Sequence, residues 1–499
     1  MIKGVSEGAR DCSLTKLTGY LLRRHVDPFI TLELMRVFNA TRCAPPLPNK
    51  DIGGLSLPSP ASNSNAGKPA MDDNIIRLAE LQDSGELSPA AEESLALAYA
   101  ERHAHELRYV AAWGRWMRYD GTRWDFDNTL HAFDRARAIC REVAADCDKT
   151  KVATAIASAK TVAAVERLAK ADRRLAATPD QWDIDPWLLQ DDCMTVNLRT
   201  GIAREPAPAD YITKKAACAA APNGTPHPLW TSFLNRITSG NVELQSFLQR
   251  YCGYATTGIT REHKFVFAYG TGANGKGTFI NTIAAIFGDY ATIADMGTFI
   301  ATNSERHPTD LAKLRGARLV VAQETQKGRR WDETKIKALT GGDKITARFM
   351  RQDFFDFEPT FKLFIAGNHK PRLHTVDEAM RRRLLLVPAV QIPPAERDPH
   401  LLQKLETERP AILRWCIDGC LEWQRIGLTP TIVQDATAAY FADQDTLQQW
   451  LDECTEDGGH AAFTRSAELF TSWKSWCEER NYKPGSAMAL SEALIDSRV

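Results

Sequence analysis

The chain has 499 residues, of which 44% are hydrophobic and 25% are charged, and its formal net charge is −1. This is the composition of an ordinary water-soluble protein, and the length predicts about two to four domains. The balanced charge excludes a polycation, so any binding of nucleic acid has to come from local basic patches. No apolar run reaches the roughly 18 residues of a membrane-spanning helix, and we therefore expect no membrane partner.

The eleven cysteines are scattered along the chain. The closest pairs are Cys416 with Cys420 and Cys140 with Cys147, and no C-x-x-C motif occurs. This pattern argues against a disulfide framework and against a zinc site, and it favours reduced thiols. Residues 1–16 contain no apolar segment of the kind that a signal peptide needs. Together these features predict a cytosolic protein.

Changes in composition along the chain predict several segments. Residues 12–41 have the apolar spacing of helices, and a dense run of Pro, Gly, Ser and Asn indicates a linker after them. β-Hairpins are predicted around Asp120-Gly121 and within residues 196–206. The predicted segments are a small helical domain (1–50), a linker (51–75), a mostly helical domain (76–225), an α/β core (226–395), a helical extension (396–445) and a small helical or winged-helix module (446–499).

Within the predicted core, short apolar runs alternate with helical patterns. The runs occupy residues 264–269, 318–322, 361–366 and 384–390. Strands that alternate with helices are typical of a mostly parallel sheet with helices on its faces. We therefore predict an α/β fold for this part of the chain.

Directly after the first of these strands comes "GTGANGKGT", residues 270–278, which nearly fits the phosphate-loop pattern G-x-x-x-x-G-K-[ST]. Backbone N–H groups of such a turn and of the helix after it point at phosphates, and Lys276 would reach the β- and γ-phosphates. A plain strand–turn–helix connection is the alternative, but strand, motif and helix rarely coincide by chance. The predicted nucleotide-binding residues are Gly270, Thr271, Gly272, Ala273, Asn274, Gly275, Lys276, Gly277 and Thr278.

One position of this phosphate loop departs from the pattern. Gly277 stands where a serine or threonine hydroxyl normally binds magnesium. Thr278 is one residue further on, which turns its side chain roughly 100° around the helix. We expect either the Thr278 hydroxyl or a water molecule to take the vacant place in the metal shell.

The next two strands end in polar residues. "RLVVAQE" ends in Glu324, which could hold magnesium or orient the attacking water, although apolar runs that end in Glu are common. "FKLFIAGN" ends in Asn368, which could hydrogen-bond to the γ-phosphate or to the water. Asn368 could also be a simple turn residue.

Basic residues gather in two places of the predicted core. Arg381, Arg382 and Arg383 precede the fourth strand, and one of them could reach a neighbouring subunit's nucleotide as an arginine finger. Residues 327–351 hold eight Lys/Arg against three Asp/Glu and include a predicted hairpin with a basic tip. Basic side chains there suit contacts with a phosphate backbone, and we predict Lys344, Arg348 and Arg351 as DNA-binding residues. A solvated charged surface is the alternative in both places.

Taken together, "GANGK", "RLVVAQET", "LTGGDKITAR", "FKLFIAGNHKP" and "DEAMRRRL" resemble the superfamily 3 helicase core. More narrowly, they resemble the phage/plasmid-type primase-helicases, which are related to the poxvirus primase-helicase. The resemblance implies an AAA+ fold, a hexameric ring, ATP and Mg²⁺ as ligands, and translocation on single-stranded or forked DNA in a bacterial host cytosol. It also implies roles for individual residues: Lys276 as phosphate ligand, Glu324 as catalytic carboxylate, Asn368 as sensor, Arg382 or Arg383 as finger, and the hairpin around Arg351 in the channel.

The resemblance extends to the segments before the core. Residues 116–127 and 196–215 are similar to the helical domain that precedes the motor, and the N-terminal piece is similar to the domain that follows a primase catalytic domain. We therefore expect the primase catalytic domain to be missing, with a separate primase or an origin-binding protein as partner.

Three functions compete at this stage. The leading hypothesis is an ATP-dependent DNA helicase for replication of a phage, prophage or plasmid. The second is a catalytically weakened DNA-binding ring protein, or a replication interference factor from a decaying prophage, which Gly277 would support. The third is an AAA+ protein remodeller, for which an aromatic, apolar pore loop is expected in place of the basic hairpin tip.

Overall fold

The chain is described by a computed structural model that forms two compact units, Met1–Gly85 and Glu86–Val499. The described residues are 5–6, 34, 36, 43–44, 90–270, 272, 274–301, 309–323, 329–351, 353–373, 377–388, 392–393, 396–428, 430–456, 463–480 and 482–496. In the first unit they include a parallel pair, β1 (Val5–Ser6) with β2 (Cys43–Ala44). The helices predicted within 12–41 lie almost wholly outside the described residues, and the predicted linker 51–75 lies wholly outside them.

The second unit begins with a helical region that carries small sheets. The predicted hairpin around Asp120-Gly121 is confirmed, because β4 and β5 pair in antiparallel fashion on either side of it. The second predicted hairpin is confirmed as well, since β8 pairs with β9. In chain order the elements are α4 (Glu92–His103), β3 (Leu107–Val110), β4 (Arg115–Tyr119), β5 (Trp124–Phe126), α5 (His131–Ala145), α6 (Thr150–Ile156), α7 (Ala159–Ala169), β6 (Ala176–Ala177), β7 (Leu188–Gln190), β8 (Thr195–Asn197) and β9 (Ile202–Arg204).

A five-stranded parallel sheet forms the centre of the next region, as the sequence predicts. Its strands lie in the order β11-β12-β15-β10-β16, so the strand that leads into the phosphate loop has a neighbour on both sides. The strands are β10 (Phe265–Tyr269), β11 (Ala291–Ile293), β12 (Leu319–Gln323), β15 (Lys362–Gly367) and β16 (Leu384–Pro388). The sequence did not predict β11, which has three residues that are at most half-buried.

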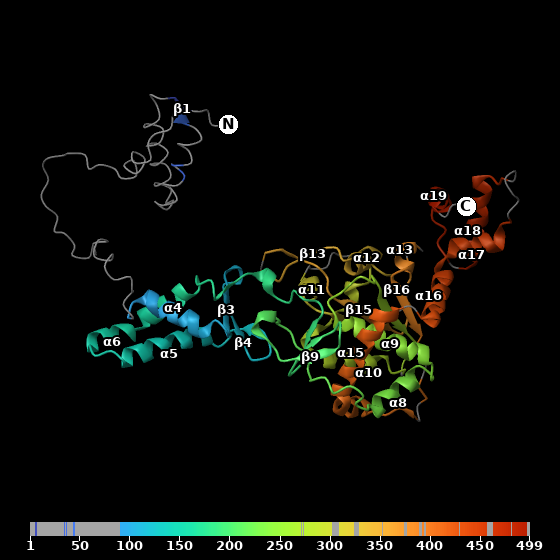
Figure 1. Cartoon of the computed structure of the whole chain (residues 1–499). Helices are drawn as coiled ribbons and strands as arrows, with labels where there is room; N and C mark the ends of the chain where they lie inside the picture. Colours follow the sequence, from blue (N-terminus) through green and yellow to red (C-terminus); the bar gives the residue numbers. More distant parts are fainter. Residues whose placement is uncertain are drawn as a thin grey trace. The chain divides into compact units, whose positions relative to one another are not determined.

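Alternate residues of these strands enter two separate hydrophobic cores. On one face, Val266 and Phe364 pack against α8 (Pro228–Ile237), α9 (Val242–Thr256), α10 (Lys276–Phe287) and α15 (Arg409–Ile426) (Figure 1). On the other face, Phe267 and Ile365 pack against α12 (Glu333–Gly341), α13 (Glu378–Arg381) and α16 (Thr431–Gln444). Parallel strands buried on both faces read as continuous apolar runs, which explains why the sequence displays them so clearly.

Helices make up the described C-terminal part. The helical pair α17 (Thr446–Cys454) and α18 (Ser466–Glu479), with α19 (Ala487–Asp496), surrounds a core rich in tryptophan that includes Trp450, Trp473 and Trp476. Within the described part of residues 446–496 there are helices but no strand. None of the helices in the described ranges is both long enough and apolar enough to cross a bilayer.

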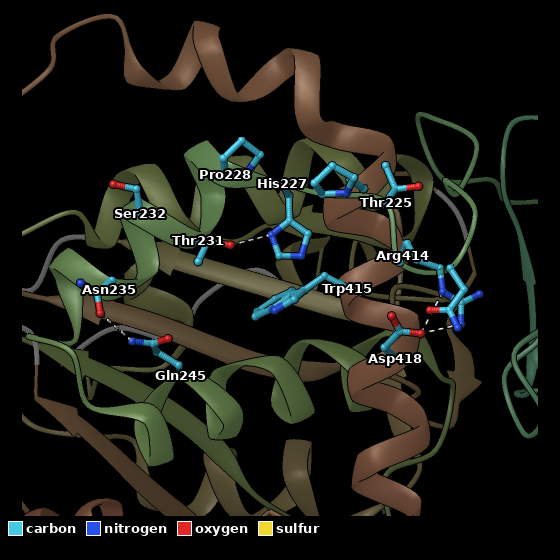
Figure 2. A pocket seen from close by; sticks show the side chains of 14 residues that line it. Thr225, His227, Pro228, Thr231, Ser232, Asn235, Gln245, Arg414, Trp415 and Asp418 are labelled. Atoms are coloured by element: carbon cyan, nitrogen blue, oxygen red, sulfur yellow. Dashed lines mark hydrogen bonds and ion pairs between the residues drawn. The ribbon is translucent and has the colours of Figure 1, made fainter.

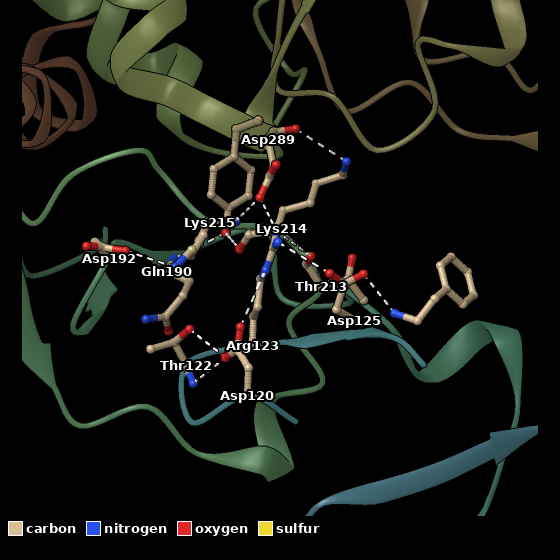
Figure 3. Close-up of polar contacts among 12 residues, drawn as sticks. Asp120, Thr122, Arg123, Asp125, Gln190, Asp192, Thr213, Lys214, Lys215 and Asp289 are labelled. Carbon is tan, nitrogen blue, oxygen red and sulfur yellow. Dashed lines mark hydrogen bonds and ion pairs between the residues drawn. The ribbon is translucent and has the colours of Figure 1, made fainter. Parts of the chain in front are cut away.

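A polar junction joins the β4–β5 turn to the end of α10 (Figure 3). Arg123 forms an ion pair with Asp289, which lies in the 3-10 turn Gly288–Tyr290 directly after α10. The same carboxylate accepts a hydrogen bond from the Lys215 backbone N–H at 3.1 Å, and Lys214 Nζ donates to the Asp289 carbonyl at 3.3 Å. The helix that begins at the phosphate loop is thus tied, at its far end, to the preceding region.

Candidate functional site

The carboxyl ends of three neighbouring strands meet at one edge of the central sheet. In the strand register, Tyr269 of β10 pairs with Gly367 of β15, and Gln323 of β12 pairs with Ala366 of the same β15. The phosphate loop after β10 and Asn368 after β15 therefore leave the sheet together, beside the end of β12 at Gln323. This carboxyl edge is where open α/β sheets bind their ligands.

Lys276, the first residue of α10, points back into the phosphate loop. Its Nζ donates to the Gly270 carbonyl at 2.6 Å and to Asn274 Oδ1 at 2.9 Å, and it lies 3.4 Å from Asn368 Oδ1. Burial lowers the pKa of the Lys276 ammonium group. The structure thus brings four of the predicted site residues to one point: Gly270, Asn274, Lys276 and Asn368.

The loop's backbone path depends on Gly275, which precedes α10. Its φ is +76°, in the left-handed region that favours glycine. A Cβ at this position would also lie 2.5 Å from Ile237 Cγ2 and 3.0 Å from a ring carbon of Phe233, both on α8. Glycine is therefore required here for its conformation and for the close approach of α8 to the loop.

The predicted metal ligands are only partly described. Thr278 lies half-buried in the first turn of α10. Glu324, which the sequence predicts as catalytic carboxylate and metal ligand, lies outside the described residues, as do Thr271 and Ala273 of the loop. Among the described residues, no cluster of three or more His, Cys, Asp or Glu side chains is placed to hold a metal ion.

The predicted arginine fingers lie at the opposite end of the sheet. Arg382 and Arg383 precede β16, whose first residue Leu384 pairs with Phe265 at the start of β10. The five residues of β10 separate this amino edge from the phosphate loop, a span of about 16 Å at roughly 3.3 Å per residue. The structure therefore does not bring Arg382 or Arg383 to Lys276 of the same chain.

A cavity of about 470 Å³ opens at this amino edge, and it is lined by Glu262, His263, Lys264, Gly341, Arg382 and Arg383. Arg383 Nη1 donates to the Ala379 carbonyl at 2.9 Å, but its buried Nε has no hydrogen-bond partner among the described residues. Burial lowers the pKa of both Arg383 and Lys264. A buried cationic N–H without an acceptor is costly, so an anion placed beside Arg383 Nε would be favourable, although Glu262 also lines this cavity.

Sequence reasoning missed Lys264 and His263 as residues of this cavity. A lysine directly before an apolar strand is common, and nothing in its local pattern marks it. The signal is the register: Phe265 N donates to the Arg383 carbonyl at 2.8 Å, which sets Lys264 beside the arginines. Only the pairing of β10 with β16 reveals that neighbourhood.

The predicted basic hairpin exists as β13 (Ile345–Ala347) paired with β14 (Phe355–Phe357). Lys344 and Arg351 are exposed, and the guanidinium of Arg348 lies 4.7 Å from the ring centre of Phe354. The apolar side chains near the tip were not predicted to matter. They are exposed to solvent by 38%, 69% and 60%, respectively, in Phe349, Met350 and Phe354.

This hairpin corrects one argument made from the sequence. The basic tip was expected to exclude a protein remodeller, because such proteins need an aromatic and apolar pore loop. The tip is both basic and aromatic, so that criterion does not separate the two functions. Exposed aromatic rings beside cations are equally what stacking of single-stranded bases requires.

A second cavity, of about 720 Å³, lies between the chain around His227 and α15 (Figure 2). His227 Nδ1 lies 2.9 Å from the Thr231 hydroxyl, and Arg414 Nε donates to Asp418 Oδ1 at 2.8 Å. None of the residues predicted to bind nucleotide, metal or DNA lines it. Its paired polar side chains favour a solvent-filled groove over a catalytic site.

Three family models match successive parts of the chain. Residues 1–53 match "Primase C terminal 1 (PriCT-1)", residues 96–239 match "D5 N terminal like", and residues 268–383 match "Family of unknown function (DUF5906)". The last of these matches contains the phosphate loop, the hairpin and the arginines. The order of the first two agrees with the resemblance deduced from the sequence.

Relatives of known name are viral. A candidate helicase of Acanthamoeba polyphaga mimivirus is 27% identical over 31% of this chain and 16% of its own length. A candidate primase of African swine fever virus is 24% identical over 49% of this chain and 28% of its own length. This chain thus spans well under a third of either relative. Together with the family models, these matches support a relationship of the chain to the phage-type primase-helicases.

Among solved structures, the apo C-terminal region of NrS-1 is similar over 82% of this chain and 86% of that one. The sequences are 11% identical there and the TM-score is 0.47, which is too low to establish a common fold.

Proposed function

We propose that this chain is a subunit of an ATP-dependent DNA helicase that translocates on single-stranded DNA during replication of a phage, prophage or plasmid. The observation that carries the proposal is the position of Lys276. Its ammonium group lies among the oxygens of Gly270, Asn274 and Asn368, at the carboxyl edge of a parallel sheet and at the start of α10. A cation at a glycine-rich helix N-terminus suits a polyphosphate.

The residues of this edge would divide the work of hydrolysis. Loop N–H groups and Lys276 would bind the phosphates, Asn368 would donate a hydrogen bond to the γ-phosphate, and Glu324 would orient the attacking water. The hydroxyl and amide oxygens present here suit Mg²⁺, which prefers oxygen ligands. Thr278 and Glu324 would hold the ion, whose charge neutralises the β- and γ-phosphates when bound.

The amino edge would act on the nucleotide of a neighbouring copy in an AAA+ ring, as a hexamer allows. Arg383 is too far from its own Lys276 to stabilise charge there, and its Nε lacks an acceptor among the described residues. We propose that Arg382 or Arg383, with Lys264 beside them, approaches the neighbour's γ-phosphate. The hairpin with Lys344, Arg348 and Arg351 would contact the DNA strand.

The second candidate is the weakened ring protein, which Gly277 favours because it lacks the metal-binding hydroxyl. Both candidates would work in a host cytosol beside a separate primase or origin-binding protein. The two candidates differ in whether the chain hydrolyses ATP, so a measurement of hydrolysis distinguishes them.

The test is ATP hydrolysis by the full chain, with and without single-stranded DNA, together with strand separation on a forked duplex. We expect DNA-stimulated hydrolysis that Lys276→Ala abolishes while its circular dichroism and melting temperature stay unchanged. DNA binding without turnover in the wild-type chain would favour the weakened ring protein. Normal turnover in the Lys276→Ala variant would contradict the helicase assignment.

A further inference from the structure

The side chain of Gln323 faces the place where the phosphate loop lacks a hydroxyl. Gly277 and Asn281 lie one turn apart on α10 and so share one face of the helix. Gln323, the last residue of β12, donates from Nε2 to Asn281 Oδ1 at 2.9 Å. A Cβ built on Gly277 would meet Gln323 Oε1 at 3.8 Å.

These contacts fix which way the Gln323 amide points. Asn281 accepts the Gln323 N–H, so the opposite end of the amide, the oxygen, is the end turned toward Gly277. A serine at position 277 would carry its hydroxyl into this same space. The bare backbone of Gly277 therefore leaves room for an oxygen that a neighbouring strand supplies.

The chemistry of this oxygen matches the missing group. Magnesium takes hard oxygen ligands, among them amide oxygens. The space beside Gly277 is one helical turn or less from Lys276, and it lies at the carboxyl edge where the phosphates would bind. The residues present thus fit a magnesium ion without the usual hydroxyl.

We propose that Gln323 supplies, through its side-chain oxygen, the metal-shell ligand that Gly277 lacks, and that Asn281 is the positioning residue that orients it. The proposal rests on the proposed nucleotide site and replaces the expectation that Thr278 or water alone fills the gap. It also explains how a glycine at this position is compatible with a working site.

The experiment measures binding of a fluorescent ADP to the full chain while Mg²⁺ is titrated, with a parallel measurement in EDTA. Loss of an outer-shell residue that orients a metal ligand typically costs about 10- to 100-fold in metal affinity. We expect Gln323→Ala to raise the Mg²⁺ concentration for half-maximal binding by about tenfold or more, with binding in EDTA unchanged. Asn281→Ala should shift the titration in the same direction by a smaller factor.

Two further variants serve as matched controls. Gln323→Glu keeps an oxygen at the same place and should keep the wild-type Mg²⁺ dependence or tighten it. Gly277→Ser combined with Gln323→Ala restores a hydroxyl in the same space and should bring the titration back toward wild type. If Gln323 served only to link β12 to α10, the Mg²⁺ titration would not depend on whether an oxygen stands at this place.

The outcomes separate this inference from the proposed function. If Gln323→Ala and Gln323→Met both titrate like wild type, Gln323 only joins β12 to α10 and the inference is wrong. If the wild-type chain binds no nucleotide, or if Lys276→Ala binds it equally well, the nucleotide site itself is wrong. Unchanged melting temperatures establish that each variant is folded.

Discussion

The cationic side chains at the two edges of the central sheet differ in the hydrogen-bond acceptors around them. At the carboxyl edge, Lys276 has oxygen acceptors from its own chain at 2.6 and 2.9 Å. At the amino edge, Arg383 and Lys264 line a cavity, and Arg383 Nε is buried without an acceptor in the described ranges. The carboxyl edge pairs its lysine with oxygens of the same chain, whereas the amino edge leaves one arginine N–H without such a partner in the described part of the chain. This difference is compatible with the proposal of a nucleotide site shared between two copies.

The largest expected effect comes from removing the arginine of the amino edge. We predict that Arg383→Ala lowers ATP hydrolysis by about 10³-fold or more, as removal of an arginine finger does. We also predict that binding of fluorescent ADP is unaffected, because Arg383 lies about 16 Å from the phosphate loop of its own chain and would approach only the γ-phosphate of a neighbour's ATP. Fluorescent-nucleotide binding and steady-state hydrolysis measure the two effects separately.

A mixing experiment shows whether the finger acts between copies. Chains carrying Lys276→Ala and chains carrying Arg383→Ala are each expected to be inactive. Equal mixing before assembly makes about one interface in four intact on both sides, and hydrolysis should return. The control is Arg381→Ala, whose guanidinium is occupied by Glu378 at 3.9 Å and by the Phe441 ring. Mixtures that stay inactive would place the two edges' functions within one chain.

The second prediction concerns the hairpin, which lies in the chain between Gly341 and Arg382 of the amino-edge cavity. Base stacking on an aromatic ring is worth about 1–3 kcal/mol, so Phe354→Ala should weaken binding of single-stranded DNA about tenfold. Arg351→Ala should weaken it less and should lower the slope of log Kd against log salt by about one. Fluorescence anisotropy with an oligonucleotide at several salt concentrations measures both quantities.

The matched control for the hairpin is Met488→Ala, which removes an apolar side chain that is 72% exposed on α19. It should leave DNA affinity unchanged. Equal losses in Met488→Ala and Phe354→Ala would show that apolar exposure in general, not the hairpin, governs binding. Such a result would mean that the hairpin is not the surface that binds DNA.

Much of the carboxyl edge could be predicted from the sequence. Strands buried on both faces appear as unbroken apolar runs, and in a parallel sheet their carboxyl ends share an edge. Knowing this, one can expect Lys276 and Asn368 to approach each other, and they do. β11 escaped prediction because it has three residues, none of which is buried, so they carry no such signal.

The amino edge could not be predicted in the same way, since it depends on strand order. The sequence gives no sign that β10 lies between β15 and β16, and that order alone sets Lys264 beside Arg383. The Gln323–Asn281 bond is equally invisible, because it joins residues that are neutral and 42 positions apart. Exposed phenylalanines on the hairpin read as core residues in a pattern of apolar letters.

A smaller effect is expected for two other cationic residues at the amino edge, Lys362 and Arg318. Lys362 begins β15 and is 2% exposed, and its Nζ donates to the carbonyls of Ile259 and Thr360 at 3.2 Å and to that of Thr257. Arg318 is held likewise, by the carbonyls of Thr256 and Leu188. These two cations have backbone acceptors, unlike Arg383 Nε, so we expect them to serve the fold and not the nucleotide.

Burial holds the pKa of the Lys362 ammonium well below its ordinary value. Between that lowered pKa and the unfolded value of about 10.4, the unfolded chain binds more protons than the folded chain. The free energy of unfolding therefore rises with pH in this window by up to about 1.4 kcal/mol per pH unit, and this contribution is lost as pH falls through the folded pKa. Lys362→Met removes this contribution. The free energy of unfolding of the wild type minus that of the variant should therefore increase with pH.

Urea unfolding of both chains between pH 7 and 10 measures this difference, with Lys474→Met as the control that removes a solvent-exposed lysine. Parallel curves for wild type and Lys362→Met would contradict a buried, titrating Lys362. A loss of hydrolysis in folded Lys362→Met comparable to that of Arg383→Ala would overturn the division between cations with and without acceptors. If hydrolysis survives in Lys362→Met, an unsatisfied N–H, and not positive charge alone, marks the residues of this edge that act on a neighbour.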